Sequence, residues 1–494
     1  MEATVATKKS NKYIIRWIIA LGIWVLFKWI LPAPAPMTPL GMEVIGIFID
    51  ICYMWLVFDV GMCSLLLLVM IVFTKAYTAT DAIRFFFGDW MFCFLFGCLM
   101  FSQAMQSTGL TRRIALWFIT RKVCKGRPWL IITMFFFSMW ILGLGMTGQA
   151  IETIFCLLLT EIIMTVGYSP EDKFSQVIFG AISMFAIYAN GMSAIGHGNF
   201  ITGMTWVEAA TGAKISITQS FLICGPTGLV GVILSILAIK YVYKVDASKL
   251  VKLDIDKVKA SIPKMNAAEK WTLTAFLICL FFWICNDVFV PIFPFLQPVG
   301  KFCASLGSAI PIIIATIMVC MIHVNGKPIL NFKEGCSKVN WTGCIMVTAI
   351  RNLGPLFSSK NAGITAWLEQ NLGPLVSGLS PILFVIVTVL LFDFMTNIVS
   401  NSVVMVFYKV LSPLAALIPG INTVATGVLL ISSIHIAYSM PACNPCAAQI
   451  VGNGHITAQN LMKYGPLLAL ICGVVLIAMG YPIACALYPG FYVQ

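Results

Sequence analysis

An internal duplication constrains this chain more than any other feature of its sequence. A tryptophan, a glycine and a polar tripeptide recur in the same order about 253 residues apart: Trp90 and Trp341, Gly109 and Gly363, Thr147-Gly148-Gln149 and Ser400-Asn401-Ser402. Basic residues follow the first glycine at Arg112, Arg113, Arg121, Lys122, Lys125 and Arg127, whereas residues 364–380 contain no lysine or arginine. Because basic flanks stay cytoplasmic, the two copies are predicted to face opposite sides of a bilayer. Such inverted repeats are typical of secondary transporters, whose site lies where the repeats meet.

The apolar stretches predict an all-α membrane protein. Of the 494 residues, 60% are hydrophobic and 10% are charged. A crossing helix needs roughly 20 apolar residues to span about 30 Å of hydrocarbon. On that basis we expect about eleven transmembrane helices, near residues 14–32, 43–59, 61–75, 85–107, 174–210, 217–242, 271–290, 302–324, 338–357, 422–451 and 464–489. Two further apolar regions, 130–165 and 381–411, are each too short for two complete crossings and are predicted to be re-entrant hairpins.

The placement of the basic residues predicts one topology for the whole chain. Four cations, Lys8, Lys9, Lys12 and Arg16, lie before or at the start of the first crossing, and residues 240–270 hold eight lysines against four acids. Both regions are expected to be cytoplasmic, which leaves the C-terminus outside. The net charge of +12 therefore reflects topology in a cell (plasma) membrane, and no nucleic-acid partner is expected. The first apolar run is expected to be an uncleaved helix.

Four predicted units follow from the duplication and the charge pattern. Residues 1–75 form an N-terminal transmembrane bundle, and residues 76–240 form the first inverted repeat, with its hairpin 130–165 on the cytoplasmic side. A cytoplasmic linker spans 241–270. The second repeat spans 271–494, with its hairpin 381–411 on the outward side.

The seventeen cysteines are scattered through apolar stretches, as small hydrophobic residues in membrane helices are. Cys443 and Cys446 flank Asn444-Pro445, but a metal or redox site normally needs a second cluster or a basic neighbourhood. Packing is the favoured interpretation of this pair. No transition-metal site is expected.

Chemistry is expected where the apolar pattern is interrupted, because backbone that leaves a helix needs hydrogen bonds from protein, ion or water. Two interruptions are hairpin tips, residues 143–149 and 396–402, and two are predicted unwound centres of broken helices, residues 190–199 and 440–446. Helix N-termini present free N–H groups that suit an anion, while unwound carbonyls suit a cation. Small hydroxyl and amide side chains add directional contacts without buried charge: Thr147, Gln149, Ser400, Asn401, Ser402 and Asn444.

These segments resemble the divalent anion/sodium symporter family, which includes citrate, succinate and sulfate carriers. The resemblance covers about 400 residues, including Phe87 to Gly97, Ser107 to Leu116, and Trp341 through Gly363 to Leu368. The family carries a Ser-Asn-Thr triplet at each hairpin tip. Ser400-Asn401-Ser402 is a close match, whereas Thr147-Gly148-Gln149 lacks the asparagine. Gln149 replaces its function one position later, or is a packed polar residue bonded to backbone.

The resemblance implies a sodium-coupled carrier, a homodimer in the bilayer, that moves a small anionic solute by an elevator motion. Carried over, the substrate residues are Thr147, Gly148, Gln149, Ser400, Asn401, Ser402, Asn444 and Pro445. The implied sodium residues are Thr147, Gly148, Gly196, Asn199, Asn397, Asn401 and Cys443. Asn397 and Asn401 are alternatives for the main tip amide, and family spacing to the Asn444-Pro445 turn favours Asn401.

Ionisable residues in apolar regions are candidate modulators, because an unpaired charge there is costly. His197 lies in the first broken helix and either substitutes for a missing cation or is a neutral ring bonded to unwound backbone. Arg351 attracts an anion or forms a structural ion pair with Asp393. Glu152 and Glu161 on the first hairpin have a structural role as their default interpretation.

The residues and the resemblance together predict sodium-coupled secondary active transport of di- or tricarboxylates. The alternatives within transport are a sodium-independent anion exchanger and a carrier of sulfate or another inorganic oxyanion. An enzyme is not expected, because the chain has no HExxH motif and only four histidines. Paired tips and broken helices suit occlusion of a solute better than the continuous pore of a channel.

Overall fold

The computed structural model describes residues 2–88, 90–143, 145–193, 198–260, 262–376, 378–441 and 443–494, with side chains from Tyr13 onward except at positions 347, 350, 351 and 354. These ranges are mostly helical. The strands among them form one short antiparallel ribbon, β1 (His323–Val324) and β2 (Lys327–Pro328). The expectation of an all-α protein is therefore met except for this surface ribbon.

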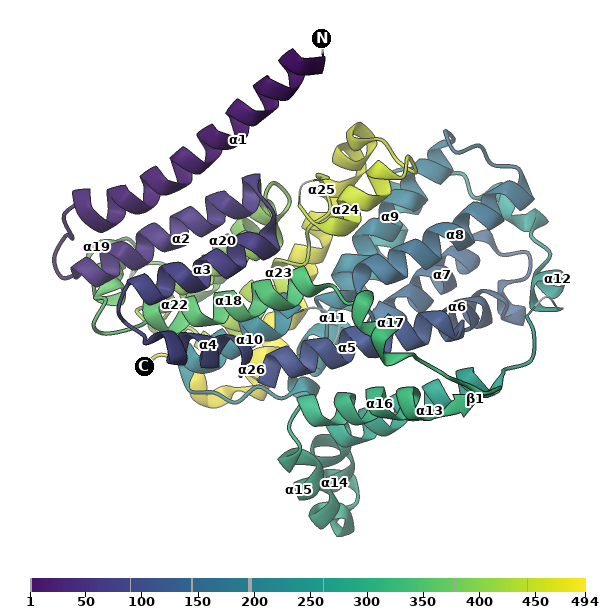
Figure 1. Ribbon diagram of the computed structural model, residues 1–494. Helices are drawn as coiled ribbons and strands as arrows, with labels where there is room; N and C mark the ends of the chain where they lie inside the picture. Colours follow the sequence, from purple (N-terminus) through teal and green to yellow (C-terminus); the bar gives the residue numbers. More distant parts are fainter. Residues whose placement is uncertain are drawn as a thin grey trace.

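The N-terminal helices pack against one another and against the second half of the chain. They are α1 (Glu2–Val25), η1 (Leu26–Ile30), α2 (Pro39–Val57), α3 (Val60–Phe73) and α4 (Ala79–Phe87). Helices α2 and α3 contact α18 (Trp341–Phe357). Helix α1 extends away from the body in Figure 1, and many of its described side chains are exposed, as expected for a helix that faces lipid.

Each half of the chain contains a helix at the repeated tryptophan, a helix after the repeated glycine and two apolar arms around a polar tip, while the inverted repeat itself stays a prediction. The first set is α5 (Trp90–Ser107), α6 (Leu110–Ile119), η2 (Lys122–Cys124), α7 (Pro128–Gly143), α8 (Gly148–Val166), α9 (Lys173–Asn190), α10 (Gly198–Thr211) and α11 (Ile217–Tyr241). The second set is α18, α19 (Ile364–Val376), α20 (Pro381–Thr396), α21 (Asn401–Val406), α22 (Tyr408–Ala415), α23 (Thr423–Ser433), α24 (Pro445–Gly452), α25 (Ala458–Val475), η6 (Leu476–Gly480), α26 (Tyr481–Leu487) and η7 (Pro489–Phe491). Gly109 and Gly363 precede α6 and α19 with φ of 82° and 67°. This left-handed backbone requires glycine at both equivalent turns.

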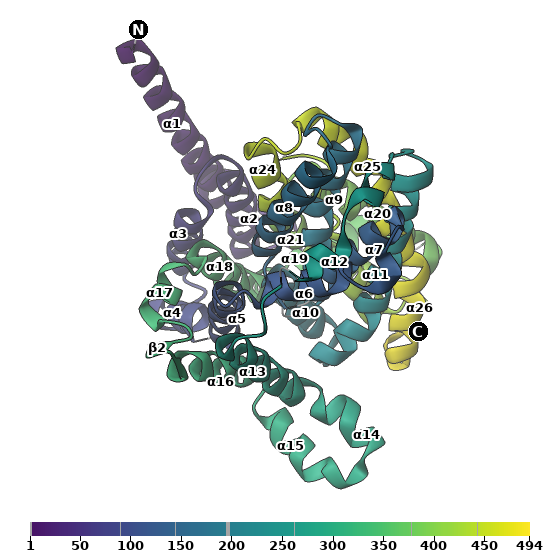
Figure 2. The same cartoon turned by 90° about the vertical axis from the view of Figure 1, so that its right-hand side faces the viewer.

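The connection between the two sets forms a separate group of helices. It contains η3 (Ser248–Lys252), α12 (Ile255–Ala260), α13 (Ala267–Ile284), η4 (Cys285–Phe289), α14 (Val290–Ile292), η5 (Pro294–Leu296), α15 (Gln297–Ser305), α16 (Ala309–Met321) and α17 (Phe332–Ser337). Asn266 and Glu269 form a capping box that starts α13. Helices α13 and α16 pack along α5, while α14 and α15 project from the body on the side opposite to α1 (Figure 2).

Seven described segments are long and apolar enough to cross a membrane, or up to nine if each of two bent pairs is one span. The seven are Tyr13–Ile30, Pro39–Val57, Ala79–Ser107, Gly148–Val166, Ile217–Tyr241, Ala267–Ile292 and Ala458–Leu487. The predicted crossing at 61–75 corresponds to α3, whose 14 residues are fewer than a crossing needs. A helical membrane protein is confirmed, while the number of about eleven crossings stays a prediction.

Both predicted hairpins consist of two apolar arms that meet at a polar tip. The first is formed by α7 and α8, and the second by α20 with α21 and α22. Helix α8, with 19 residues, is long enough to cross a membrane, but α7 has only 16. The pair therefore does not supply two full crossings, and re-entry from one side remains a prediction for both hairpins.

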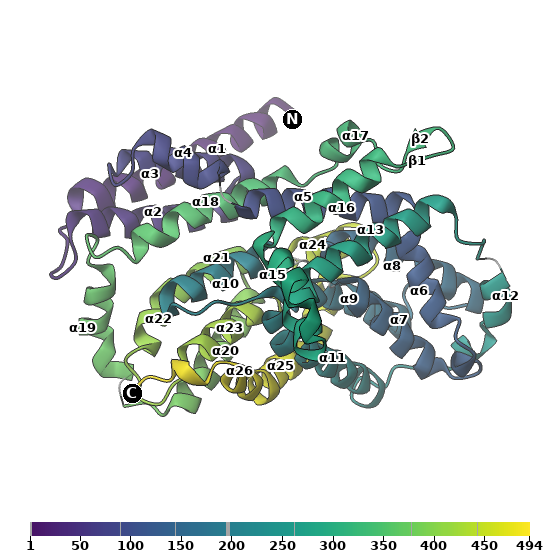
Figure 3. The ribbon, with the colours of Figure 1, turned by 90° about the horizontal axis from the view of Figure 1, so that it is seen from below.

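Two helix pairs contact both hairpins. They are α9 with α10 and α23 with α24, and α9 contacts α24 while α10 contacts α23. Figure 3 shows α7, α8 and α9 on one side of the body and α10, α21 and α23 on the other, with α18 and α5 along one edge. The two predicted broken helices therefore cross-connect the two hairpins.

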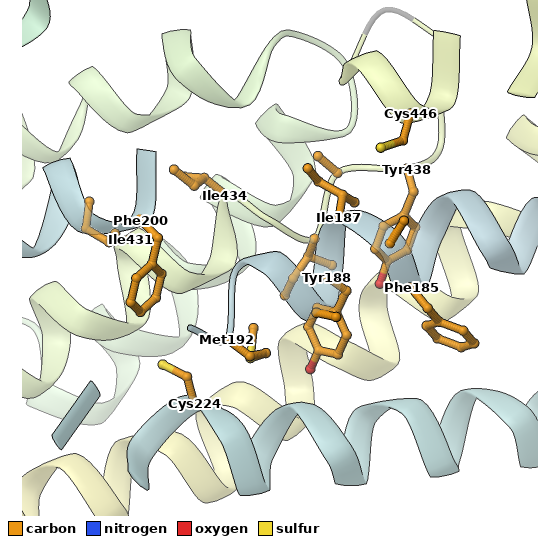
Figure 4. Packing of buried hydrophobic residues seen from close by; sticks show 14 of the residues in the cluster. Phe185, Ile187, Tyr188, Met192, Phe200, Cys224, Ile431, Ile434, Tyr438 and Cys446 are labelled. Carbon is orange, nitrogen blue, oxygen red and sulfur yellow. The ribbon is translucent and has the colours of Figure 1, made fainter. Parts of the chain in front are cut away.

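Helix α9 is the centre of the hydrophobic core. Every residue from Phe174 to Asn190 is buried. Figure 4 shows Ile187 and Tyr188 beside Tyr438, and Met192 close to Cys224 of α11. A Cβ at Gly203 would lie 2.3 Å from Ile431, so glycine lets α10 approach α23 closely. This tight packing fixes the positions of the interruptions that carry polar residues.

Candidate functional site

A cavity of about 240 Å³ lies where both hairpin tips and both broken helix pairs meet α3, α5 and α18. The tips contribute Gly145 to Gln149 and Ser400 to Ser402; the broken pairs contribute Ile187, Asn190, Gly198, Asn199, Pro445 and Cys446; the remaining helices contribute Val60, Leu95, Cys98, Leu99, Asn340, Thr342, Gly343, Cys344 and Met346. None of these described lining residues is acidic or basic. The cavity therefore offers neutral polar groups and apolar surface.

Several helices begin at the cavity. Helix α8 starts at Gly148, α10 at Gly198 and α24 at Pro445, and all three residues line it. The Thr147 side chain forms no capping hydrogen bond, so the first N–H groups of α8 lack that partner. Free N–H groups and the positive ends of helix dipoles favour a negatively charged ligand.

The second tip presents an amide donor to the cavity. Asn199 of α10 donates through Nδ2 to Asn401 Oδ1 at 3.3 Å and to Ser402 Oγ at 2.9 Å. Asn401 is 3% exposed, and its Nδ2 donates to no described residue. Because buried polar groups are normally hydrogen-bonded, this amide is a strong candidate to bind a ligand oxygen.

Asn190 is a cavity residue that was not singled out as a site residue from the sequence. It ends α9, and its Nδ2 donates to the carbonyls of Gly143 at 2.9 Å and Met146 at 2.5 Å. Its Oδ1 is buried without a hydrogen-bond partner among the described residues. A Cβ at Gly148 would lie 2.7 Å from this oxygen. Asn190 thus occupies space beside the tip and supplies a carboxamide where the tripeptide has glycine.

Asn397 has a different environment from Asn401. Its Nδ2 donates to Asp393 Oδ1 at 3.0 Å and to the Ile436 carbonyl at 2.6 Å. Its Oδ1 accepts from the N–H groups of Tyr438 at 3.0 Å and Ser439 at 2.9 Å. Asn397 does not line the cavity. Geometry therefore favours Asn401 as the tip amide, while Asn397 fastens the tip to the chain between α23 and α24.

In the Asn444-Pro445 turn, Asn444 has a structural role and Pro445 lines the cavity. Asn444 donates to the Ala437 carbonyl and accepts from the Ala447 N–H at 3.0 Å, which caps α24. Pro445 and Cys446 line the cavity. Cys443 is a buried free thiol whose carbonyl accepts from the Asn401 N–H at 3.4 Å. Asn444 and Cys443 thus position the turn and the second tip.

The structure brings most of the predicted residues together. Those that line the cavity are Thr147, Gly148, Gln149, Asn199, Ser400, Asn401, Ser402 and Pro445. Asn397, Cys443 and Asn444 lie behind its wall. Gly196, His197 and the side chain of Arg351 are outside the described part of the chain, so the suggested pairing of Arg351 with Asp393 stays a prediction.

Helix α18 supplies polar cavity residues that sequence reasoning missed. Asn340 accepts through Oδ1 from the Gly343 N–H at 3.1 Å, and Thr342 lies at the same helix start. The sequence signal that could have indicated them is Trp341, the repeated tryptophan of the second copy, which is adjacent to both residues. Only the contacts of α18 with α3, α5 and α10 place its first turn at the cavity.

Comparison with known proteins identifies the family. The model of the sodium:sulfate symporter transmembrane region matches residues 8–487. The chain belongs to this family. A sodium-dependent dicarboxylate transporter, SdcS, of Staphylococcus saprophyticus is 24% identical over 500 aligned residues, which cover 96% of this chain and 93% of the relative. SdcS of Staphylococcus aureus strain NCTC 8325 is 21% identical over 479 residues, covering 89% and 85%.

Membership in the sodium:sulfate symporter family confirms the resemblance seen in the sequence and places the chain among transporters rather than enzymes. The family match extends over the helices that surround the cavity, including both hairpins. The first triplet lies within the matched residues, and there Asn190 stands beside Gly148.

Proposed function

We propose that this protein is a secondary active transporter of dicarboxylates or tricarboxylates, coupled to sodium. The observation that carries the proposal is the uncharged cavity into which the N-termini of α8, α10 and α24 open. Neutral donors bind an oxyanion without adding a fixed charge that would oppose its release. The names of the SdcS relatives support a dicarboxylate and sodium.

The proposed anion site uses donors from both tips. One carboxylate is placed near the Asn401 amide and the hydroxyl groups of Ser400 and Ser402, and the other near the N-terminus of α8. Gln149 and the start of α24 at Pro445 complete the predicted contacts. A cavity of about 240 Å³ is large enough for a small dianion but leaves little room for bulky solutes.

The groups present fit a sodium ion beside the first tip. Sodium prefers oxygen ligands, and Asn190 Oδ1 is a buried acceptor without a described hydrogen-bond partner. Thr147, Gly148 and Asn199 are the further residues proposed to hold the ion. Bound sodium supplies positive charge that offsets the charge of the substrate.

We further propose an elevator motion in a homodimer located in the plasma membrane, with a cytoplasmic N-terminus and an external C-terminus. The cavity is bounded on one side by the tips and broken helices and on the other by α3, α5 and α18. A mobile unit that contains the tips can carry a solute past this second wall. The four predicted units 1–75, 76–240, 241–270 and 271–494 keep the same proposed boundaries.

Transport into proteoliposomes tests this function. Labelled succinate, citrate and sulfate are offered with an inward sodium gradient, and with choline in place of sodium. We expect sodium-driven accumulation of labelled succinate. The relative uptake of citrate and sulfate then defines the substrate class. Sodium-independent uptake that requires an anion inside the liposomes would instead establish an exchanger and refute symport. Preference for sulfate over both carboxylates would refute the proposed substrate class.

A further inference from the structure

Glu152 is a buried acid that the proposed anion and sodium sites do not use. It lies on α8 one turn after Gly148 and is 1% exposed. Neither carboxylate oxygen accepts a hydrogen bond from a described N–H or O–H group, and the polar group beside them is the weakly donating thiol of Cys446. The other acid of this arm behaves differently, because Glu161 pairs with Arg112 at 3.1 Å on an exposed surface. An ion pair therefore supports the expected structural role of Glu161, but not that of Glu152.

The titratable groups that face Glu152 are thiols. Cys446 of α24 lies beside the carboxyl group, and Cys156 lies one turn further along α8. Helix α7 contains no ionisable residue. The ionisable groups described beside Glu152 are therefore thiols and not cations.

The ionisable groups on α9 and η3, which also pack against α8, have other partners or are exposed. The ionisable residues of α9 are Lys173 at its first position and Tyr188, which lies against Gly231 of α11. In η3, Lys249 pairs with Asp172 at 3.3 Å, and Lys252 is exposed. No described cation pairs with Glu152.

This location is directly behind the cavity wall. Gly148 and Cys446 both line the cavity, and a Cβ at Gly148 would lie 3.0 Å from Cys446 Sγ. An ionised carboxylate without a partner is strongly disfavoured in such surroundings, whereas the neutral acid is tolerated. Ionisation of Glu152 therefore requires water to reach it through the cavity.

We propose that Glu152 binds a proton when the cavity binds its anion and releases the proton when the anion leaves, so that the carrier moves a proton together with its anion. This inference rests on the proposed transport function. The proton comes from cavity water, forms an O–H bond with one carboxylate oxygen, and returns to water on the opposite side when the anion leaves. A proton fits this position better than a sodium ion, because hard cations need several oxygen ligands and the ionisable groups beside Glu152 are the thiols of Cys446 and Cys156.

Proton movement during succinate uptake tests the inference. Proteoliposomes contain a pH-sensitive dye, and the external pH is kept where succinate is fully ionised. Wild-type protein is expected to acidify the interior in proportion to succinate uptake. The ratio of protons to anions should fall to the level of protein-free liposomes in Glu152→Gln, which resembles the protonated side chain. Glu161→Gln on the same helix is the matched control and should keep the wild-type ratio.

Two results would overturn the proton site: no proton movement with wild-type uptake, or an unchanged ratio in Glu152→Gln. Absence of any anion uptake by the wild type would instead refute the transport function itself. A second measurement on the wild-type protein covers the case in which the variant does not insert. Dicyclohexylcarbodiimide, which modifies protonated buried carboxyl groups, should label Glu152 less as pH rises; labelling that is absent at every pH overturns the proposal.

Discussion

Removal of the carboxamide should affect substrate binding at one of the two asparagines near the second tip and protein stability at the other. Asn401→Ala loses bonds from Asn199 at 3.3 Å and Ser402 at 3.4 Å. A neutral hydrogen bond contributes about 1 kcal/mol, so the loss of folding stability should be about 1–2 kcal/mol. The lost donor to a carboxylate is worth about 1.5–3 kcal/mol, which corresponds to an increase of about 10- to 150-fold in the KM for succinate.

Asn397→Ala should be mainly a stability defect. It leaves the buried N–H groups of Tyr438 and Ser439 without their acceptor and removes donors to Asp393 and Ile436. Each buried N–H group left without an acceptor costs about 1–3 kcal/mol, so the two together predict a loss of about 2–6 kcal/mol. Asn397 does not line the cavity, and surviving protein should keep a KM close to that of the wild type.

Thermal melting of purified protein and initial rates of labelled succinate uptake separate the two effects. Uptake is normalised to the amount of folded protein in the liposomes. An unchanged KM in Asn401→Ala would remove that amide from the anion site. Equal melting temperatures for the two variants would contradict the structural role assigned to Asn397.

The remaining predictions concern the first tip and the contact between α6 and α13. Gly148→Ala should cost about 1–3 kcal/mol through overpacking, because its Cβ would lie 2.7 Å from Asn190 Oδ1, and melting should show the loss. Asn190→Ala should raise the sodium concentration for half-maximal succinate uptake by about tenfold, equivalent to about 1.4 kcal/mol; an unchanged sodium curve contradicts this role. Arg113→Ala should lower stability by about 3 kcal/mol because it leaves buried Glu269 without its bidentate partner, whereas exposed Arg112→Ala should cost under about 1 kcal/mol. Equal melting of these two arginine variants would refute that reasoning.

The sequence predicted the membrane class and the tips because their signals are local. Long apolar runs identify membrane helices, and polar interruptions identify where the backbone leaves them. Ser400 to Ser402 and Thr147 to Gln149 therefore pointed to residues that line one cavity. The number of crossings was harder to predict because α3 has only 14 residues and two bent helix pairs share apolar stretches.

The details of the site depend on tertiary contacts that the sequence does not display. Asn190 was visible only as the start of an interruption, and its contact with the first tip requires α9 to pack against α7 and α8. Asn397 and Asn401 are chemically identical, and only their partners separate them. Asn340 and Thr342 face the cavity because α18 begins there.

The central claim is that the two tips bind the transported anion between them in the presence of sodium. A cryo-electron microscopy structure of the protein in lipid nanodiscs with succinate and sodium tests it most directly, with a matched sample in choline. We predict density for the dianion between Gly148 and Asn401, next to Pro445, in the sodium sample and its loss in choline. Succinate density at another location, with an empty cavity between the tips, would contradict the account.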